Sequence, residues 1–447
     1  MTYTLPKHID SNKIFLVNKK DIEQRLDSYF YSTEFILNIN RIINKDYACL
    51  HNLVEFSSEY WNQKDYYSKT FPYIEISGID IDNGEICNVS NVDVKDAPSR
   101  AKVIVRTDDI IISTTRPHRG AIAMVDKQIN LSIASTGFSV IRNVSSKIYR
   151  QYLYIVLRLP FILKQLQQRS TGGNYPAITQ EELGNILVPL PPKDKQQQII
   201  DLYNTAYNQK KAKEQQAKEL LASIDEYLLN ELGITLPNID NSLPSRVFIV
   251  NSKEISNSRF DPKGVLFLGD KMKSCIYDNI QLKDIAFIQK GTAITSNEID
   301  SNGIYPVIAG GQTSPYKHSE YNYKGNIITI SASGAYAGYV WYHKNPIFAS
   351  DCSVIYSKDE NSFCTNYIFE VLKAQQNHIY LLQIGAGQPH VYPDDLAKLW
   401  IPIVTLEKQK EIADHITEIR QKAKQLQDEA KQLLQQTKTE IEQMILE

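Results

Sequence analysis

The sequence predicts an α+β protein, with two similar mixed α/β globular units separated by two long helices that pair as an antiparallel coiled coil. The first observation behind this prediction is a repeat. Val188–Ile200, a proline-containing segment followed by Lys-Gln and a long helical run, is echoed by Ile401–Ile412 and a second such run. The offset from Pro189 to Pro402 is 213 residues, and the two Lys-Gln pairs have the same offset. A repeat of so long a period indicates duplicated domains and not the short units of a solenoid.

The second observation is that both helical runs carry apolar residues at alternating steps of four and three. This 3.5-residue periodicity makes a narrow apolar seam, which needs a partner helix. Because duplication supplies two matched helices, we expect them to pair with each other. Packing of each helix on its own domain, or dimerisation between chains, are the alternatives. The residues expected at the contact are Ile199, Tyr203, Ala206, Leu220, Ile224, Ile412, Ile416, Ile419, Leu426 and Leu433.

The globular units are duplicated as well, and each alternates short β-branched and aromatic runs with turn residues, which is typical of strands. A helical stretch at Lys147–Gln168 is expected to kink or split at Pro160, with a counterpart near Asn366–Gln383. The offset between matches falls from 233 (Val250 minus Val17) to 213. The matched pairs are Phe15–Asp27 with Phe248–Asp261, Ile110–Ser113 with Ile327–Ser331, Ser139–Ile141 with Ser353–Ile355, and Thr171–Ile178 with Ile384–Val391.

These repeats predict four parts along the 447 residues. The globular units occupy residues 1–190 and 236–404, and the helices occupy residues 191–235 and 405–447. Identity between the two globular units is low except at framework positions. The sequence therefore indicates a scaffold that was kept while its surfaces diverged.

Composition indicates a cytosolic globular protein, because the hydrophobic content of 42% and charged content of 22% are ordinary. The most apolar run, Tyr152–Leu163, is interrupted by Arg158 and Pro160, so no membrane span is expected. The start, Met1–Pro6, lacks the pattern of a secretory leader. The five cysteines form no CxxC or Cys/His cluster, so the sequence predicts neither a metal site nor a disulfide framework.

The sequence contains no catalytic constellation. It has no GxxxxGK[ST] loop, GxGxxG turn, Asp/Asn-Pro-Pro-aromatic motif or HExxH motif. Asp80, Asp82 and Glu85 are close together, but they belong to a glycine-containing turn that is typical of a solvated loop. The formal net charge of −2 means that any nucleic-acid binding depends on local charge. We therefore expect a non-catalytic reader or adaptor.

At Val188–Ile200, Ile401–Ile412 and the two glycine-rich segments before them, the chain resembles the specificity subunit of type I restriction-modification systems. The resemblance covers almost the whole chain. It implies that each globular unit is a target recognition domain, which reads one half of a split site in double-stranded DNA, and that the paired helices are a spacer. It also implies docking of two methylation subunits and of restriction subunits. This chain would hold no cofactor, since S-adenosylmethionine, ATP and Mg²⁺ are expected on the partners.

In the first unit, the DNA contacts are expected in two segments. The first segment is Arg100–Arg119, which includes the most basic turn of the chain, Thr114–Gly120. Arginine can bond guanine or hold phosphate, although a solvated turn is the alternative. Arg169–Tyr175 is the second segment, where glycines let the backbone approach a phosphate, although a left-handed cap on the preceding helix is the alternative. The candidate residues are Arg100, Lys102, Arg116, His118, Arg119, Arg169, Thr171, Asn174 and Tyr175.

In the second unit, the corresponding segments are polar and aromatic but hardly basic. Positive charge is expected from two lysines that flank Tyr321 and Tyr323, although a tyrosine-rich hairpin is often only a packed strand pair. The candidate residues are Lys317, Lys324, Ser333, Tyr336, Gln388, His390 and Tyr392.

Two other functions compete with DNA reading. A coiled-coil scaffold would show no sequence specificity, and a nuclease would need a carboxylate site, which the scattered acidic residues do not predict. The same scaffold also suits a complex that only methylates DNA.

Overall fold

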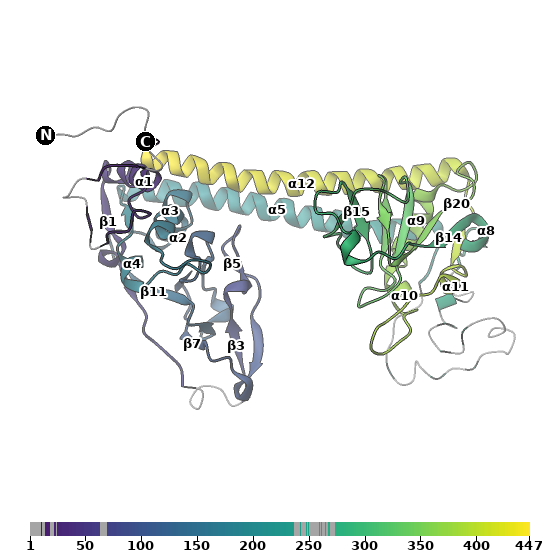
Figure 1. The fold of residues 1–447 in the computed structure, drawn as a ribbon, viewed down its shortest axis with the longest axis horizontal. Coiled ribbons are helices and arrows are strands. Elements are labelled where there is room, and N and C mark those ends of the chain that lie inside the picture. The colour runs from purple at the N-terminus through teal and green to yellow at the C-terminus, as the bar shows by residue number, and fades with distance from the viewer. Residues whose placement is uncertain are drawn as a thin grey trace. The chain divides into compact units, whose positions relative to one another are not determined.

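The computed structural model describes residues 10, 14–17, 22–23, 25–62, 69–236, 242, 247, 249, 259, 261, 264, 267–268 and 273–447 (Figure 1). The chain divides into two compact units. Unit 1 comprises Met1–Ala212 with Glu429–Glu447, and unit 2 comprises Lys213–Asp428. Among the described residues, no helix is both long enough and apolar enough to cross a bilayer.

Unit 1 is built on two four-stranded sheets. In spatial order, the first sheet contains β6 (Ser90–Asp93), β3 (Thr70–Ile74), β10 (Ile133–Ser135) and β7 (Ala101–Ile104). The second contains β2 (Val54–Phe56), β11 (Phe138–Val144), β8 (Ile110–Ser113) and β9 (Ile122–Met124). Two further strand pairs are β1 (Tyr47–Cys49) with β12 (Leu187–Pro189) and β4 (Ile79–Asp80) with β5 (Glu85–Ile86). The helices are α1 (Thr33–Ile43), α2 (Arg150–Leu157), α3 (Pro160–Arg169), α4 (Gln180–Gly184) and the first part of α5 (Lys193–Leu232).

Unit 2 repeats this plan with fewer strands. Its main sheet contains β14 (Ala286–Lys290), β20 (Cys352–Ser357), β17 (Ile327–Ser331) and β18 (Val340–His343). A smaller sheet contains β16 (Lys317–His318), β15 (Tyr305–Ile308) and β19 (Phe348–Ala349), and β13 (Asn279–Gln281) pairs with β21 (Trp400–Pro402). The helices are α8 (Leu282–Ile285), α9 (Thr365–Ala374), α10 (Gln376–Tyr380), α11 (Pro393–Leu396) and the first part of α12 (Leu406–Leu446).

The predicted split at Pro160 is confirmed. α2 ends at Leu157, and α3 begins at Pro160, which stands in the first turn of α3. Proline is tolerated at this position because the first helical N–H groups have no partner inside the helix. The counterpart in unit 2 is likewise two helices, α9 and α10.

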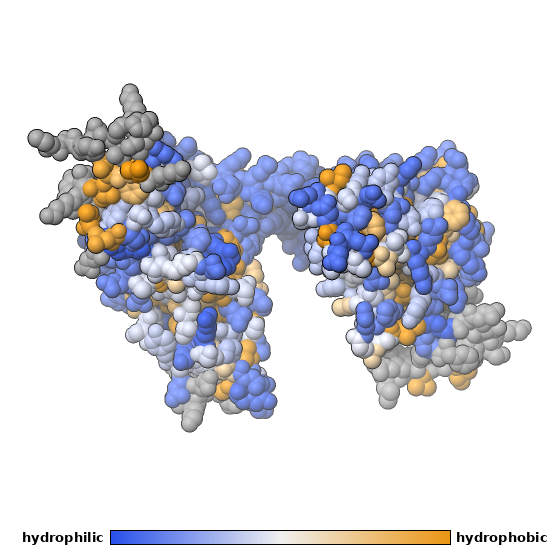
Figure 2. Space-filling view, viewed as in Figure 1, coloured by the Kyte–Doolittle hydropathy of each residue, from blue (hydrophilic) through white to orange (hydrophobic). Residues whose placement is uncertain are grey.

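The two long helices run antiparallel, and this is visible within each unit separately. In unit 1 the start of α5 (Ile199 and Tyr203) shares one buried cluster with the end of α12 (Leu434 and Ile441). In unit 2 the end of α5 shares a cluster with the start of α12, through Ile224, Leu228, Leu232, Ile412 and Ile416. In Figure 2 the side of the helical pair that faces the viewer is mostly hydrophilic, and the buried clusters contain apolar residues of both helices.

Most of the ten expected seam residues are buried. Seven are at most 6% exposed: Ile199, Tyr203, Ala206, Ile224, Ile412, Ile416 and Leu426. Leu220 and Ile419 are partly buried against the same clusters. Leu433 is only partly buried, and its neighbour Leu434, 3% exposed, occupies the core position.

The repeated Lys-Gln motif has a structural explanation, because its glutamine ties the start of each long helix to the globular domain. Gln196 and Gln409 are fully buried. The Gln196 carboxamide accepts a hydrogen bond from Tyr149 N (2.9 Å) and donates to Pro191 O (2.9 Å). Gln409 repeats both bonds, with Cys364 N (2.8 Å) and Val404 O (3.0 Å). The repeated glutamine therefore makes the same two hydrogen bonds at the start of both long helices.

Replacing Gln196 by alanine is expected to lower the free energy of unfolding by about 2–3 kcal/mol, because buried backbone groups lose their partner. Gln197→Ala is the matched control, since Gln197 is exposed and its side chain donates to Asp201 on the same helix, with no other side-chain bond among the described residues. Urea unfolding of the full chain measures the difference. Equal midpoints for the two variants would show that the Gln196 contacts do not stabilise the fold.

Three further contacts recur at matched positions. The Tyr152 hydroxyl donates to Pro189 O (3.1 Å), as the Tyr367 hydroxyl does to Pro402 O (2.9 Å). Arg25 Nε pairs with Asp27 (2.9 Å), and Nη1 donates to the carbonyl of Arg169 (3.2 Å). In unit 2, these places are taken by Arg259, Asp261 (2.6 Å) and the carbonyl of Leu382 (2.7 Å). Of the predicted match Phe248–Asp261, only Ile249, Arg259 and Asp261 lie within the described residues.

The pKa of His343, at the end of β18, predicts that unit 2 loses stability in acid. Its Nε2 lies 2.8 Å from the Thr329 hydroxyl, and burial lowers the pKa of His343 from 6.5 to about 4. The unfolded chain takes up a proton near pH 6.5 that the folded chain excludes until about pH 4. The contribution of neutral His343 to the free energy of unfolding is therefore fully present above pH 6.5 and is lost as the pH falls towards 4.

We expect this loss to reach about 3 kcal/mol between neutral pH and pH 4. His343→Gln removes the titrating group, so the stability of this variant should fall less over the same range. Urea unfolding of both proteins across the range measures the difference in slope. Parallel stability profiles would exclude His343 as the source of the acid sensitivity.

Candidate nucleic-acid interface

In unit 1, the structure brings the two predicted segments together. Thr115 forms an isolated antiparallel bridge with Ala177, and Arg116 N donates to Pro176 O (2.7 Å). The Arg116 guanidinium lies 4.2 Å from the centre of the Tyr175 ring and donates to Asn174 O (2.8 Å). Predicted residues that are about sixty positions apart in the sequence thus share one surface.

Left-handed backbone shapes both loops. Arg116 has φ 48° and precedes a 3₁₀ turn, Pro117–Arg119, which ends at Gly120 with φ 80°. Gly172, with φ 107°, turns the second loop, and Thr171 and Ala177 close it through two hydrogen bonds of 2.8 Å. The alternative of a left-handed helix cap is wrong, since Ser170 after α3 is extended (φ −77°, ψ 148°). The positive φ of Gly172 therefore forms the turn of the second loop and does not cap α3.

The charge of the first loop is available for binding. Arg119 is exposed and Arg116 half-buried, and neither has an ion-pair partner among the described residues. Burial lowers the pKa of His118, and the two neighbouring arginines lower it further. His118 is therefore neutral at pH 7, and the positive charge of the loop comes from its two arginines. Thr171, Asn174 and Tyr175 are exposed.

Arg100 and Lys102 are both exposed, and Arg100 is connected to the first loop through backbone hydrogen bonds. Arg100 O accepts from Thr136 N (2.8 Å), and the next residue, Gly137, accepts from Thr114 N (2.7 Å). Lys102 lies on β7, where its carbonyl accepts from Trp61 N (2.9 Å). Both side chains keep their charge accessible.

Arg169 requires a correction, because its guanidinium is not available to DNA. The side chain is only 6% exposed and pairs with Glu182 (2.8 Å) and Glu23 (3.0 Å). These two carboxylates raise the pKa of Arg169, against the opposing effect of burial. The buried Arg169 side chain therefore links α3 to Glu182 on α4 and to Glu23 in the N-terminal segment.

Unit 2 assembles the same two loops from different residues. Ser333 forms the isolated bridge with His390, and Gly334 N donates to Pro389 O (3.0 Å). The rings of His390 and Tyr392 stack at 6.2 Å. Tyr336, Gln388 and Tyr392 are exposed, whereas Ser333 is 9% exposed and its hydroxyl donates to Asp351.

Lys317 and Lys324 do not join these loops through any hydrogen bond or ion pair found in the described part of the chain. Both are exposed, Lys317 on β16 and Lys324 just before β17. The nearby tyrosines make packing contacts: Tyr321 meets the Tyr305 ring edge-on at 5.1 Å, and Tyr323 pairs with Ile347. These tyrosines therefore behave as the packed strand pair that was the alternative.

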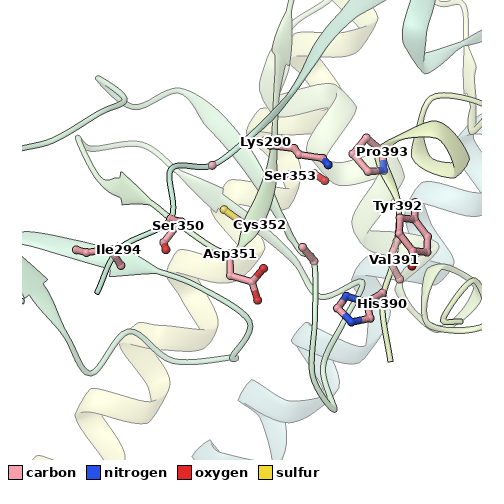
Figure 3. A pocket seen from close by; sticks show the side chains of 13 residues that line it. Lys290, Ile294, Ser350, Asp351, Cys352, Ser353, His390, Val391, Tyr392 and Pro393 are labelled. Carbon is pink, nitrogen blue, oxygen red and sulfur yellow. The ribbon is translucent and has the colours of Figure 1, made fainter. Parts of the chain in front are cut away.

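A cavity of about 440 Å³ opens beside the loops of unit 2 (Figure 3). Lys290, Asp351, His390 and Tyr392 bring polar atoms to its wall. Sequence reasoning missed Asp351 and Lys290. The repeat could have indicated Asp351. This residue lies two positions before Ser353–Ile355, and the equivalent position before Ser139–Ile141 in unit 1 is Gly137.

The acidic turn of unit 1 is explained by protein contacts. Ligand atoms of Asp80, Glu85 and Cys87 lie within 4.8 Å of one another. However, Asp80 accepts hydrogen bonds from the turn, including Asn83 Nδ2 (2.6 Å), and Glu85 pairs with Lys211 (2.6 Å). These partners support the interpretation of this segment as a turn.

Comparison with known proteins identifies the family. The model of the type I restriction modification DNA specificity domain matches residues 50–222 and 277–436. The chain is 30% identical over 119 residues to the HindI specificity subunit of Haemophilus influenzae, covering 26% of this chain and 25% of that one. It is 31% identical over 144 residues to the MpnII specificity subunit of Mycoplasma pneumoniae, covering 31% and 42%. The matched segments thus span less than half of either relative.

The fold has a solved counterpart. A chain solved in work on complex assembly and conformational transition of the type I R-M system is similar with a TM-score of 0.53 and 20% identity, covering 90% of this chain and 96% of that chain. That likeness supports the fold alone. Since two copies of the family model cover more than half of the sequence, the chain belongs to the type I restriction modification DNA specificity domain family.

Proposed function

We propose that this chain is a sequence-reading subunit that recognises a bipartite, asymmetric site in double-stranded DNA. The observation that carries the proposal is that both units build the same pair of loops with the same backbone bonds, while the side chains on those loops differ. The same loop backbone with different side chains would allow the two units to recognise different base sequences. Residues 1–190 and 236–404 would be the two target recognition domains.

The long helices would be the spacer and the docking surface. Their antiparallel pairing in both units supports this role, since a helical pair of constant length would keep the number of unread base pairs constant. The partners would be two methylation subunits and, in a restricting complex, restriction subunits. These partners would carry S-adenosylmethionine, ATP, Mg²⁺ and the chemistry, in the cytoplasm. Because the net charge is only −2, they would also supply much of the phosphate contact.

Selection from a library of duplexes with random sequence tests this proposal. Assembled with its methylation subunits, the full chain should enrich a split motif, with two groups of fixed bases separated by unspecified ones. Enrichment of no motif would favour a scaffold without sequence specificity, and a single contiguous motif would contradict reading by two units.

A further inference from the structure

The reading loops of the two units carry different chemistry at equivalent positions. Thr114 N donates to Gly137 O (2.7 Å) in unit 1, and Ala332 N donates to Asp351 O (3.1 Å) in unit 2. The residue after each acceptor begins a long strand, β11 or β20, which pairs with β8 or β17 in the same manner. Gly137 and Asp351 therefore occupy the same place in the fold.

A second pair of equivalent positions, on the loop that follows β8 or β17, is occupied by Arg116 in unit 1 and Gly334 in unit 2. Arg116 N donates to Pro176 O (2.7 Å), and Gly334 N donates to Pro389 O (3.0 Å). Both residues have positive φ, 48° and 85° respectively. At these two equivalent places, unit 1 thus presents arginine and glycine, whereas unit 2 presents glycine and aspartate. Arginine can only donate hydrogen bonds, and an ionised carboxylate can only accept them.

Asp351 is positioned for binding. It is exposed, and its Oδ2 accepts a hydrogen bond from the buried Ser333 hydroxyl, which orients the carboxylate. Its Oδ1 has no hydrogen-bond or ion-pair partner among the described residues. Figure 3 shows Asp351 and His390 on the wall of the 440 Å³ cavity, with Lys290 and Tyr392 around it.

A carboxylate on a surface that meets DNA is repelled by the phosphates, and a hydrogen bond that it accepts from a base offsets this repulsion. In the major groove, cytosine presents the N4 amino donor alone, whereas adenine adds the N7 acceptor beside its amino group. An acceptor-only group therefore matches cytosine best. Resting on the DNA-reading function proposed above, we propose that Asp351 selects a cytosine in one half-site by accepting a hydrogen bond from its N4 amino group.

The test is selection from random-sequence duplexes with the full chain assembled with its methylation subunits, as wild type, Asp351→Asn and Asp284→Asn. Asp284→Asn removes the same charge from an exposed residue of unit 2 that does not line the cavity. The wild type and this control should enrich a motif with a fixed cytosine in one half-site. Asp351→Asn should lower the preference for that cytosine by about tenfold and leave the other half-site unchanged.

The outcomes separate the two proposals. If the wild type enriches no motif, the DNA-reading function itself fails. If the wild type enriches a split motif that Asp351→Asn leaves unchanged, only the assignment of Asp351 is overturned. Loss of both half-sites together would also overturn it, because the residue would then support the fold. Ser333→Ala keeps the charge but frees the carboxylate, so it should weaken the preference at the same base pair and at no other.

Discussion

Replacing Arg116 and Arg119 together by alanine is expected to abolish sequence-specific retention of DNA, with a loss of about 100-fold in specific affinity. Arg116 precedes the 3₁₀ turn Pro117–Arg119 and contacts the Thr171–Pro176 loop, and Arg119 ends that turn; neither arginine has an ion-pair partner among the residues described. Their removal leaves no buried charge behind, so assembly with partner subunits should be unaffected. A gel-shift assay with target and random duplexes measures the effect.

Lys127→Ala with Lys147→Ala is the matched control, since both lysines are exposed in unit 1 outside the two loops. The control variant should bind target and random duplexes more weakly by the same factor, because it loses positive charge but no base contacts. Unchanged specific binding by the arginine variant would remove this loop from the interface.

Replacing Arg420 by alanine is expected to destabilise unit 2 by about 3–5 kcal/mol, because it strands a buried charge. Arg420 on α12 forms a two-fold pair with Glu370 on α9, at 2.5 and 2.7 Å, and the Glu370 side chain is only 1% exposed. Burial raises the pKa of Glu370, and Arg420 opposes that rise. Without Arg420 the pKa should rise further, so the variant should regain stability as the pH falls and Glu370 becomes neutral.

Lys422→Ala, an exposed change two residues further along α12, should have little effect. The double variant Arg420→Leu with Glu370→Leu should keep most of the stability that Arg420→Ala loses, since both charges are then absent. Urea unfolding of the four proteins supplies the comparison. An Arg420→Ala variant as stable as the wild type would show that this pair does not anchor α12 to unit 2.

The duplication and the helical pair were predictable because they depend on local periodicity. Steps of three and four in α5 and α12 reflect helix geometry, which a single sequence displays directly. The shift of the seam from Leu433 to Leu434 was not predictable. Adjacent leucines satisfy the same pattern, and only packing in unit 1 selects between them.

The candidate interface was predictable in position but not in detail. The glycine-rich and basic segments were identified, because glycine favours left-handed turns and arginine can bond guanine or phosphate. Arg169 was misassigned since its partners Glu182 and Glu23 are brought to it only by tertiary folding. Asp351 was missed for the same reason, because its role depends on Ser333 and on a cavity that no sequence window contains.

Methylome sequencing of cells that express this chain with its partner methyltransferase tests the central claim most directly. Two unlike readers on one chain should yield a split, asymmetric motif with methylated adenines in both halves. Methylation at a contiguous motif, at two identical half-sites, or without any shared motif would contradict the account.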